Sequence, residues 1–181
     1  MRIELEETVC VVIDFQEKLM PFIHNFEDMI TRSGKLLLGL QKLGVPTLIT
    51  QQYTKGLGAT VPAIVDSLGE AFIPVEKMTF SCCGELEFMQ NLLALNPANV
   101  IIIGIETHIC VLQSALDFIG QGMNAIIVED CTSSRNPRDR EVAIERMRHE
   151  GAVVTTYESI LMELLRTSAS EKFKEISKII K

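Results

Sequence analysis

Short apolar runs alternate along this chain with segments in which apolar residues recur every three or four positions. Runs rich in Val and Ile are typical of strands that are buried on both faces. They predict strands at residues 8–16, 47–50, 71–75, 100–103, 124–128 and 152–156. Helical spacing predicts helices at residues 26–43, 62–68, 85–95, 107–119, 139–150, 159–165 and 170–181.

Strands and helices therefore alternate from one end of the chain to the other. This alternation predicts a single α/β domain over residues 1–181: a three-layer αβα sandwich around a mainly parallel sheet of about six strands. Residues 166–181 are expected to form a C-terminal tail helix. Pro74 lacks an amide hydrogen, so the third strand is expected at an edge of the sheet.

The segment 100–119 is the most informative stretch of the chain. Four β-branched residues end at Gly104, and Thr107 is a good candidate for the N-cap of the helix that follows. Cys110 is then expected in the first turn of this helix, where the helix dipole and free amide groups favour a thiolate. The alternative is that Cys110 is a small buried core residue, since free cysteine is often buried.

Two more reactive side chains follow predicted strands. Asp14 comes after five apolar residues of the first strand, and Lys77 comes just after the third strand. The carboxyl ends of parallel strands share one edge of a sheet, so Asp14, Lys77 and Cys110 are expected to converge there. A thiol beside an ammonium and a carboxylate suits nucleophilic acyl transfer. The alternatives are a solvated lysine and an aspartate that caps a turn.

Composition narrows the classes of function. The net charge of −7 argues against a nucleic-acid partner. No apolar run reaches the length of a membrane span, and with its acidic amino terminus the chain is not expected to carry a signal peptide. The five cysteines are odd in number and lack paired spacing, which argues against disulfides and a structural zinc site. A cytoplasmic location is therefore expected.

The predicted helix at 107–119 is apolar on more than one side. Such a helix needs cover beyond one face of a sheet, which indicates either a subunit interface or a helix enclosed by its own chain. A nucleotide-binding loop is not expected here, because the turn after residue 103 contains a single glycine, Gly104.

Several motifs of the chain resemble those of the isochorismatase-like cysteine hydrolases, a family related to nicotinamidase and carbamoylsarcosine amidohydrolase. The matching segments are residues 12–16, 76–81, 104–110, 128–134 and 147–152. The resemblance implies a Rossmann-like hydrolase fold with a six-stranded parallel sheet, usually assembled as a homo-oligomer, a dimer or larger. It also implies cleavage of C–N bonds in small amides, carbamoyl compounds and ureides through a thioester.

The same resemblance implies roles for individual residues. Asp14, Lys77 and Cys110 match the catalytic triad of the family. A cis peptide bond is implied between Ile105 and Glu106, with the N–H groups of Glu106 and Cys110 as the oxyanion hole.

The sequence differs from two groups of this family in residues that bear on their chemistry. Nicotinamidases carry an Asp and two His as metal ligands after the second strand, whereas residues 51–58 here contain neither histidine nor carboxylate. No metal and no other cofactor is therefore expected. The isochorismatases that cleave a vinyl ether lack the nucleophilic cysteine, so Cys110 disfavours that reaction. The chain is thus similar to an uncharacterised subgroup.

The leading interpretation is a cysteine hydrolase that acts on a small molecule, with no nucleic-acid or membrane partner. The residues expected to line its substrate site are Phe15, Tyr53, Phe80, Ile105 and Thr107. Three further residues are expected at the same edge, in contact with substrate or a neighbouring subunit: Asp130, Ser133 and Ser134. The alternatives are an isochorismatase-type vinyl-ether hydrolase and a non-catalytic oligomeric binding protein.

Overall fold

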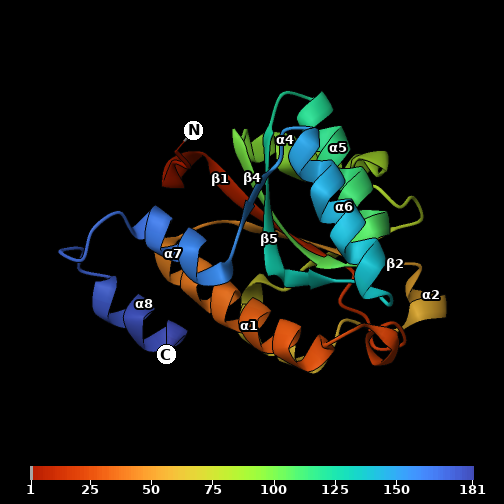
Figure 1. The fold of residues 1–181 in the computed structure, drawn as a ribbon, viewed down its shortest axis with the longest axis horizontal. Helices are drawn as coiled ribbons and strands as arrows, with labels where there is room; N and C mark the ends of the chain where they lie inside the picture. Colours follow the sequence, from red (N-terminus) through yellow and green to blue (C-terminus); the bar gives the residue numbers. More distant parts are fainter. Residues whose placement is uncertain (1) are drawn as a thin grey trace.

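Six parallel strands form one sheet in the order β3-β2-β1-β4-β5-β6 (Figure 1). This arrangement is seen in a computed structural model that describes residues 2–181. The strands are β1 (Thr8–Ile13), β2 (Thr47–Gln52), β3 (Pro74–Lys77), β4 (Asn99–Ile105), β5 (Asn124–Ser133) and β6 (Val153–Thr155). The predicted parallel sheet is confirmed, and β3, which begins at Pro74, is an edge strand as expected.

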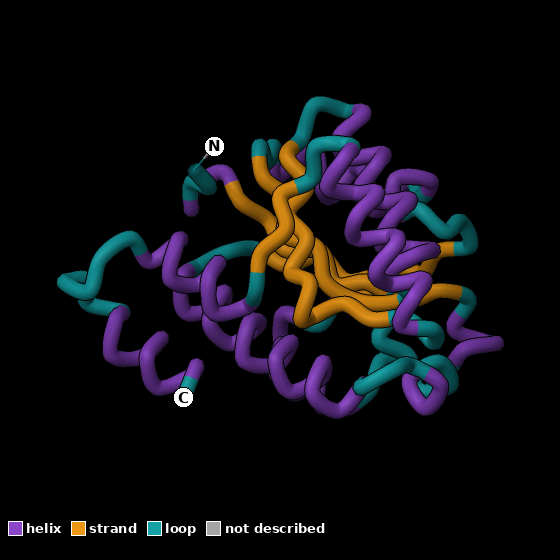
Figure 2. The backbone as a smooth tube through the Cα atoms, viewed as in Figure 1, coloured by secondary structure: helices purple, strands orange, loops and turns teal. Residues whose placement is uncertain are grey.

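Helices cover both faces of the sheet and make the predicted three layers (Figure 2). On one face lie α1 (Phe26–Leu43), α3 (Pro62–Leu68), α7 (Tyr157–Leu165) and α8 (Phe173–Ile180), and on the other α4 (Leu86–Leu95), α5 (Leu112–Gly120) and α6 (Pro137–His149). The helix α2 (Thr54–Leu57) is a single turn that is not among the predicted helices. Within residues 2–181, no helix combines the length and apolar character that crossing a bilayer requires.

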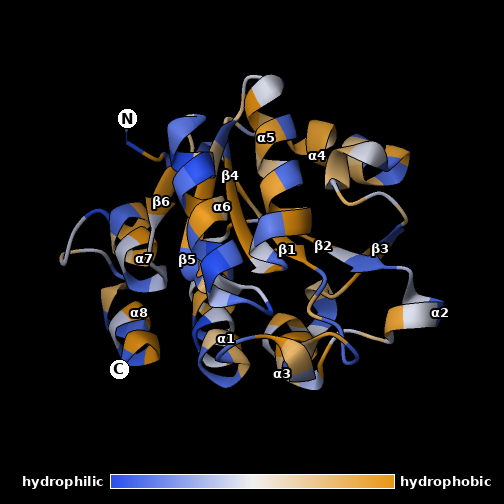
Figure 3. Ribbon diagram, turned by 45° about the vertical axis from the view of Figure 1, so that its right-hand side comes forward, coloured by the Kyte–Doolittle hydropathy of each residue, from blue (hydrophilic) through white to orange (hydrophobic). Residues whose placement is uncertain are grey.

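The hydrophobic core consists of two layers, one on each face of the sheet. Alternate residues of β1 contribute to the two layers: Val12 packs with α1 and α3, whereas Val11 packs with α4 and α5. Every residue of β1 and β4 is buried, and Figure 3 shows these central strands as hydrophobic. The unbroken apolar runs in the sequence reflect this burial on both sides.

The apolar sides of α5 are covered within the chain. Ala115 and Phe118 are fully buried, and Leu116 packs against the same core layer. The Phe118 ring also lies 6.3 Å from that of Phe88 on α4, measured between ring centroids. Of the two explanations for the apolar pattern, enclosure by the chain accounts for these residues.

The backbone between β4 and α5 differs from the prediction. Strand β4 continues through Gly104 to Ile105, and residues Thr107–Val111 form a turn of π-helix. Thr107 therefore does not cap α5, because it is itself the first residue of this turn. Gly104 has a φ of +126° and lies so close to the Ile13 backbone that a β-carbon there would collide with it. Glycine is thus required at this position.

Candidate active site

Asp14, Lys77 and Cys110 meet at the carboxyl edge of the sheet. Asp14 follows β1, Lys77 is the last residue of β3, and Cys110 lies in the π-turn after β4. Strands β1 and β4 are neighbours in the sheet, but the chain continues from β1 toward one edge of the sheet and from β4 toward the other. Open α/β sheets bind ligands at the carboxyl ends of two such strands. All three side chains are buried, with exposed fractions of 1% for Asp14 and Lys77 and 7% for Cys110.

Lys77 contacts both other members of this group. Its Nζ atom lies 2.7 Å from Asp14 Oδ2 and 3.4 Å from Cys110 Sγ. The second carboxylate oxygen, Asp14 Oδ1, accepts a hydrogen bond of 2.9 Å from the Thr50 hydroxyl. The three residues that the sequence predicted to converge therefore lie together, with Lys77 in contact with both of the others.

Neutral oxygen atoms complete the surroundings of the Lys77 ammonium group. Its Nζ donates to Gln52 Oε1 at 2.5 Å and to the carbonyl oxygens of Thr79 and Phe80 at 3.2 and 3.1 Å. Burial lowers the pKa of Lys77, but its interactions with Asp14 above all, and with Cys110, outweigh burial, so the pKa is raised above its usual value. Lys77 therefore carries its positive charge at neutral pH.

The expectation that Cys110 has a lowered pKa is wrong. Burial raises the pKa of its thiol to about 12, and the negative charge of Asp14 adds to this effect, whereas Lys77 opposes both. Burial likewise raises the pKa of Asp14, against the opposing effect of Lys77. The resting site at neutral pH thus holds a neutral thiol beside a Lys–Asp ion pair, and Asp14 is a stronger base than an exposed aspartate.

We expect Cys83 to be alkylated before Cys110 in the resting protein. Cys83 is only partly buried and has a pKa of about 11, whereas Cys110 is less exposed and less acidic. Because both thiols are protonated at neutral pH, each iodoacetamide rate should rise about tenfold per pH unit between pH 7 and 10. Peptide mass spectrometry over a time course gives both rates. A Cys110 rate that reaches a plateau near pH 7 would contradict the raised pKa.

The turn before Cys110 contains the backbone feature that the resemblance implies. The peptide bond between Ile105 and Glu106 is cis. Ile105 and Thr107 are both fully buried, and the Thr107 hydroxyl has no hydrogen-bond partner among residues 2–181.

The residues expected to line the site differ in exposure. Phe15 is 1% exposed and lies in the core layer on the α1 side, whereas Tyr53 and Phe80 are 44% and 54% exposed at the surface. Two surface cavities, of about 350 and 230 Å³, are lined by other residues than the Asp14, Lys77 and Cys110 group. Tyr53 and Phe80 are thus free to contact a ligand, whereas Phe15 is enclosed in the core and not exposed to one.

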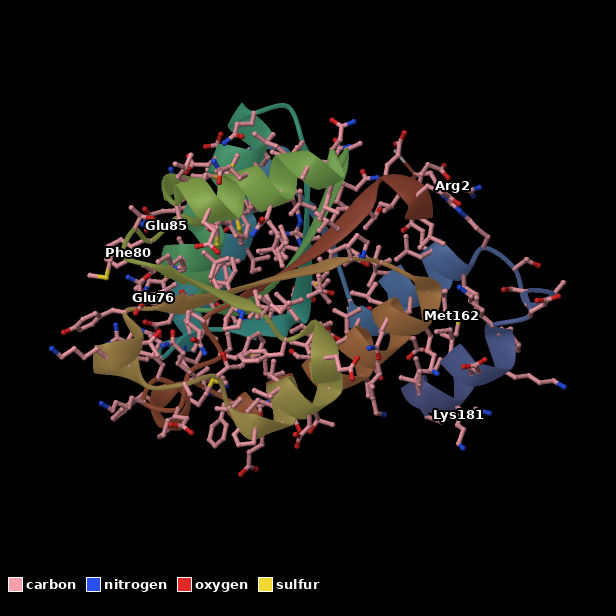
Figure 4. The ribbon with its side chains drawn as sticks, turned by 180° about the vertical axis from the view of Figure 1, so that it is seen from behind. Arg2, Glu76, Phe80, Glu85, Met162 and Lys181 are labelled. Atoms are coloured by element: carbon pink, nitrogen blue, oxygen red, sulfur yellow. The ribbon has the colours of Figure 1, made fainter. Side chains whose placement is uncertain are left out.

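The loop that carries Phe80 is held in place by Glu85. Glu85 Oε1 accepts hydrogen bonds from the backbone N–H groups of Met78 and Thr79, at 2.8 and 3.1 Å. These bonds lower the pKa of the Glu85 carboxyl group. Figure 4 shows Phe80 and Glu85 at the same edge of the molecule as Glu76. This tether fixes the carbonyl oxygens of Thr79 and Phe80 that contact Lys77.

Two glutamines of this site, Gln16 and Gln52, were not predicted. Gln16 is fully buried and donates from Nε2 to the carbonyl oxygens of Gln52 and Gly58, while its Oε1 accepts from the Gln52 N–H. Gln52 in turn accepts from Lys77 and donates to the Met78 carbonyl oxygen. Gln16 at the end of the predicted strand 8–16 was a visible signal, because a buried amide needs hydrogen-bond partners. The hydrogen-bond partners of this glutamine could not be identified from the sequence.

No group of three or more His, Cys, Asp or Glu residues within 2–181 is arranged to hold a metal ion.

A comparison with known families places the chain. The profile of the isochorismatase domain matches residues 8–159. The chain belongs to the isochorismatase family. Isochorismatase domain-containing protein 1 of Danio rerio is 41% identical over 170 residues, which are 93% of this chain and 59% of that protein. Isochorismatase domain-containing protein 2A of Mus musculus is 38% identical over 184 residues, 99% of this chain and 85% of that protein. The chain thus spans only about three-fifths of the first of these family members.

Solved structures of the isochorismatase-like fold superimpose closely on this chain. A structure described as MAR1 ribonuclease from Caenorhabditis elegans has a TM-score of 0.93 and 39% identity, covering 99% of this chain and 92% of that one. YcaC of Escherichia coli, described as an octameric hydrolase of unknown specificity, also has a TM-score of 0.93 but only 21% identity, covering 99% and 89%. The latter similarity shows the fold alone.

Proposed function

We propose that this isochorismatase-family protein is a cysteine-dependent hydrolase that cleaves the C–N bond of a small amide, carbamoyl or ureide substrate. The observation that carries the proposal is the position of Lys77 Nζ, which touches both Asp14 Oδ2 and Cys110 Sγ. A buried nucleophile, base and ammonium in contact at the edge of a parallel sheet match the requirements of acyl transfer.

The first step forms the thioester. The thiol proton of Cys110 passes to Asp14 as the sulfur attacks the substrate carbonyl carbon, which gives a tetrahedral intermediate with a negatively charged oxygen. Asp14 then donates this proton to the leaving nitrogen, the C–N bond breaks, and ammonia or an amine departs. The high pKa of Cys110 is compatible with this order, because the thiolate forms only during attack.

The second step hydrolyses the thioester. Asp14 removes a proton from a water molecule, the hydroxide adds to the thioester carbon, and the C–S bond breaks to release a carboxylic acid product. The proton held by Asp14 returns to the Cys110 sulfur. Lys77 stays protonated throughout, since its pKa is raised, and it stabilises negative charge on Asp14 and on the sulfur.

The backbone of the turn supplies the stabilisation of the oxyanion in this proposal. The N–H groups of Glu106 and Cys110 are the proposed donors; Glu106 follows the cis peptide bond, and Cys110 is the nucleophile itself. Two such donors in a site that excludes water lower the barrier more than they do in water. The limited exposure of Cys110 favours a small substrate. Tyr53 and Phe80 are the proposed outer contacts, and Thr107 offers its free hydroxyl.

A screen of primary amides, carbamoyl compounds and ureides, with released ammonia as the readout, tests this proposal. At least one compound is expected to be hydrolysed by the full chain and not by Cys110→Ala. Two other outcomes oppose it. Turnover of isochorismate that survives Cys110→Ala supports the vinyl-ether reaction, and absence of any turnover supports a non-catalytic binding protein.

Ribonuclease activity is a second candidate, favoured by the 39% identical protein described as a ribonuclease. The net charge of −7 opposes it, because RNA binding relies on basic surface. Incubation of a labelled single-stranded RNA with the wild type and with Cys110→Ala separates the two activities. Cleavage by the wild type that is lost in the variant would assign RNA as a substrate.

We expect Gln52→Met to slow turnover by about tenfold, since it removes the amide oxygen that orients Lys77. The matched control is Gln41→Met, which makes the same change at an exposed position on α1. The rate of ammonia release, measured at saturating substrate, should fall in the first variant alone. Equal rates in the two variants would show that Asp14 and the carbonyl oxygens of Thr79 and Phe80 suffice to position Lys77.

Self-association and a reducing compartment are also proposals. The fold shared with YcaC, described as octameric, supports a homo-oligomer. Sedimentation equilibrium would measure the mass of this oligomer. All five cysteines are free thiols, which supports a cytoplasmic location.

A further inference from the structure

The end of β5 lies against the turn that leads to Cys110. Strands β4 and β5 are paired from Asn99 to Ile102, and after a shift in register Thr132 pairs with Gly104 and Ser133 with Ile105. Strand β5 thus accompanies β4 to the cis peptide bond. The next two residues, Ser134 and Arg135, therefore lie beside the π-turn.

Both of these residues bind side chains of the turn. The Arg135 backbone N–H donates to Glu106 Oε2 at 2.9 Å, and Arg135 Nε lies 3.1 Å from both Glu106 oxygens. The Ser134 hydroxyl lies 2.9 Å from His108 Nδ1. The turn before Cys110 is therefore tethered at two places by a segment distant in the sequence.

The ion pair between Glu106 and Arg135 is asymmetric. The Glu106 side chain is 7% exposed, whereas the Arg135 side chain is 61% exposed. A buried carboxylate is costly without a partner, and within residues 2–181 Arg135 is the cation that contacts it. Arg135 can be replaced at the surface without opening a cavity in the core, so the effect of its charge can be isolated.

The location of the Glu106 carboxylate matters for the chemistry proposed above. Glu106 follows the cis peptide bond, and its own N–H is one of the two proposed oxyanion donors. A negative charge on the same residue opposes the charge that develops on the substrate oxygen, unless a cation cancels it.

We propose that Arg135 is a positioning residue, which holds the Cys110 turn through Glu106 and cancels the charge of that carboxylate beside the developing oxyanion. This inference rests on the proposed hydrolase function. Arg135 does not touch the reacting atoms, and it acts on catalysis through Glu106.

Arg135→Met tests the proposal, with Arg138→Met as the matched control. Arg138 is an exposed arginine three residues further along, paired with Glu141 on α6, so its loss changes the total charge equally. With the best substrate from the ammonia screen, Arg135→Met should lower kcat on the order of 100-fold with little change in KM. Arg138→Met should match the wild type.

A second variant separates charge from geometry. The double variant Glu106→Gln/Arg135→Met carries no unpaired charge, so it should recover at least about tenfold of the lost rate. Arg135→Lys keeps the charge without the planar guanidinium, and it should lie between the wild type and Arg135→Met. A merely structural pair would lower the midpoint of thermal unfolding and leave kcat unchanged at temperatures where the variant is folded.

The outcomes distinguish this inference from the proposed function. If the wild type hydrolyses an amide and Arg135→Met keeps the control rate, or if the double variant is as slow as Arg135→Met, the inference is overturned. If no compound is hydrolysed, the proposed function fails. The rate at which acrylamide alkylates Cys110 then tests the inference by itself. Arg135→Met should then be alkylated more slowly than Arg138→Met, and the double variant should recover. Equal rates overturn the inference.

Discussion

Cys110→Ala is expected to lower the rate of amide hydrolysis by at least about 10⁴-fold. The variant keeps the ion pair between Asp14 and Lys77 but has no atom that can form the thioester. The matched control is Cys83→Ala, because Cys83 lies outside the group formed by Asp14, Lys77 and Cys110. Ammonia release at saturating substrate gives both rates.

Residual hydrolysis by Cys110→Ala would contradict this expectation. A rate within tenfold of the wild type would show that a water molecule, activated by Asp14, attacks the substrate directly. The same result with isochorismate as substrate would favour the vinyl-ether reaction.

Removal of one member of the buried ion pair is expected to have the largest effect on stability. Asp14→Asn leaves the fully buried Lys77 ammonium without its carboxylate, and should lower the free energy of unfolding by about 3–5 kcal/mol. The double variant Asp14→Asn/Lys77→Met removes both charges and should recover most of this loss. Urea unfolding at pH 7 measures both values. The matched control is Lys42→Met, which breaks the exposed pair with Glu175 and should cost less than about 1 kcal/mol.

The stability of Lys77→Met should fall as the pH rises, whereas in ordinary acid unfolding stability falls as the pH is lowered. Burial raises the folded-state pKa of Asp14, and loss of Lys77 removes the charge that opposes this effect. A group with a raised folded-state pKa stabilises the fold below its unfolded pKa and loses that contribution as the pH rises through the folded value. The variant should therefore be less stable at pH 8 than at pH 5. Equal stability at both values would show that water reaches Asp14.

The fold could be predicted well from the sequence, because its signals are local. The apolar run of β4 and the periodicity of α1 each reflect burial of a single element, and α1 has the predicted bounds. The meeting of Asp14, Lys77 and Cys110 could also be predicted, since parallel strands bring their carboxyl ends to one edge.

What could not be predicted depends on contacts between distant segments. The helix dipole and a nearby lysine were visible in the sequence and predicted an acidic Cys110, but the burial that raises its pKa was not. The π-turn was missed because Thr107 has the local features of an N-cap. The roles of Gln52 and Arg135 arise from partners 25 and 29 residues away.

The proposed thioester on Cys110 can be detected by mass spectrometry of the enzyme quenched with acid during steady-state turnover. We expect the peptide containing Cys110 to gain the mass of the substrate acyl group, and this adduct to disappear once the substrate is exhausted. Continued release of ammonia with no adduct on Cys110, or with the acyl group on another residue, would contradict it.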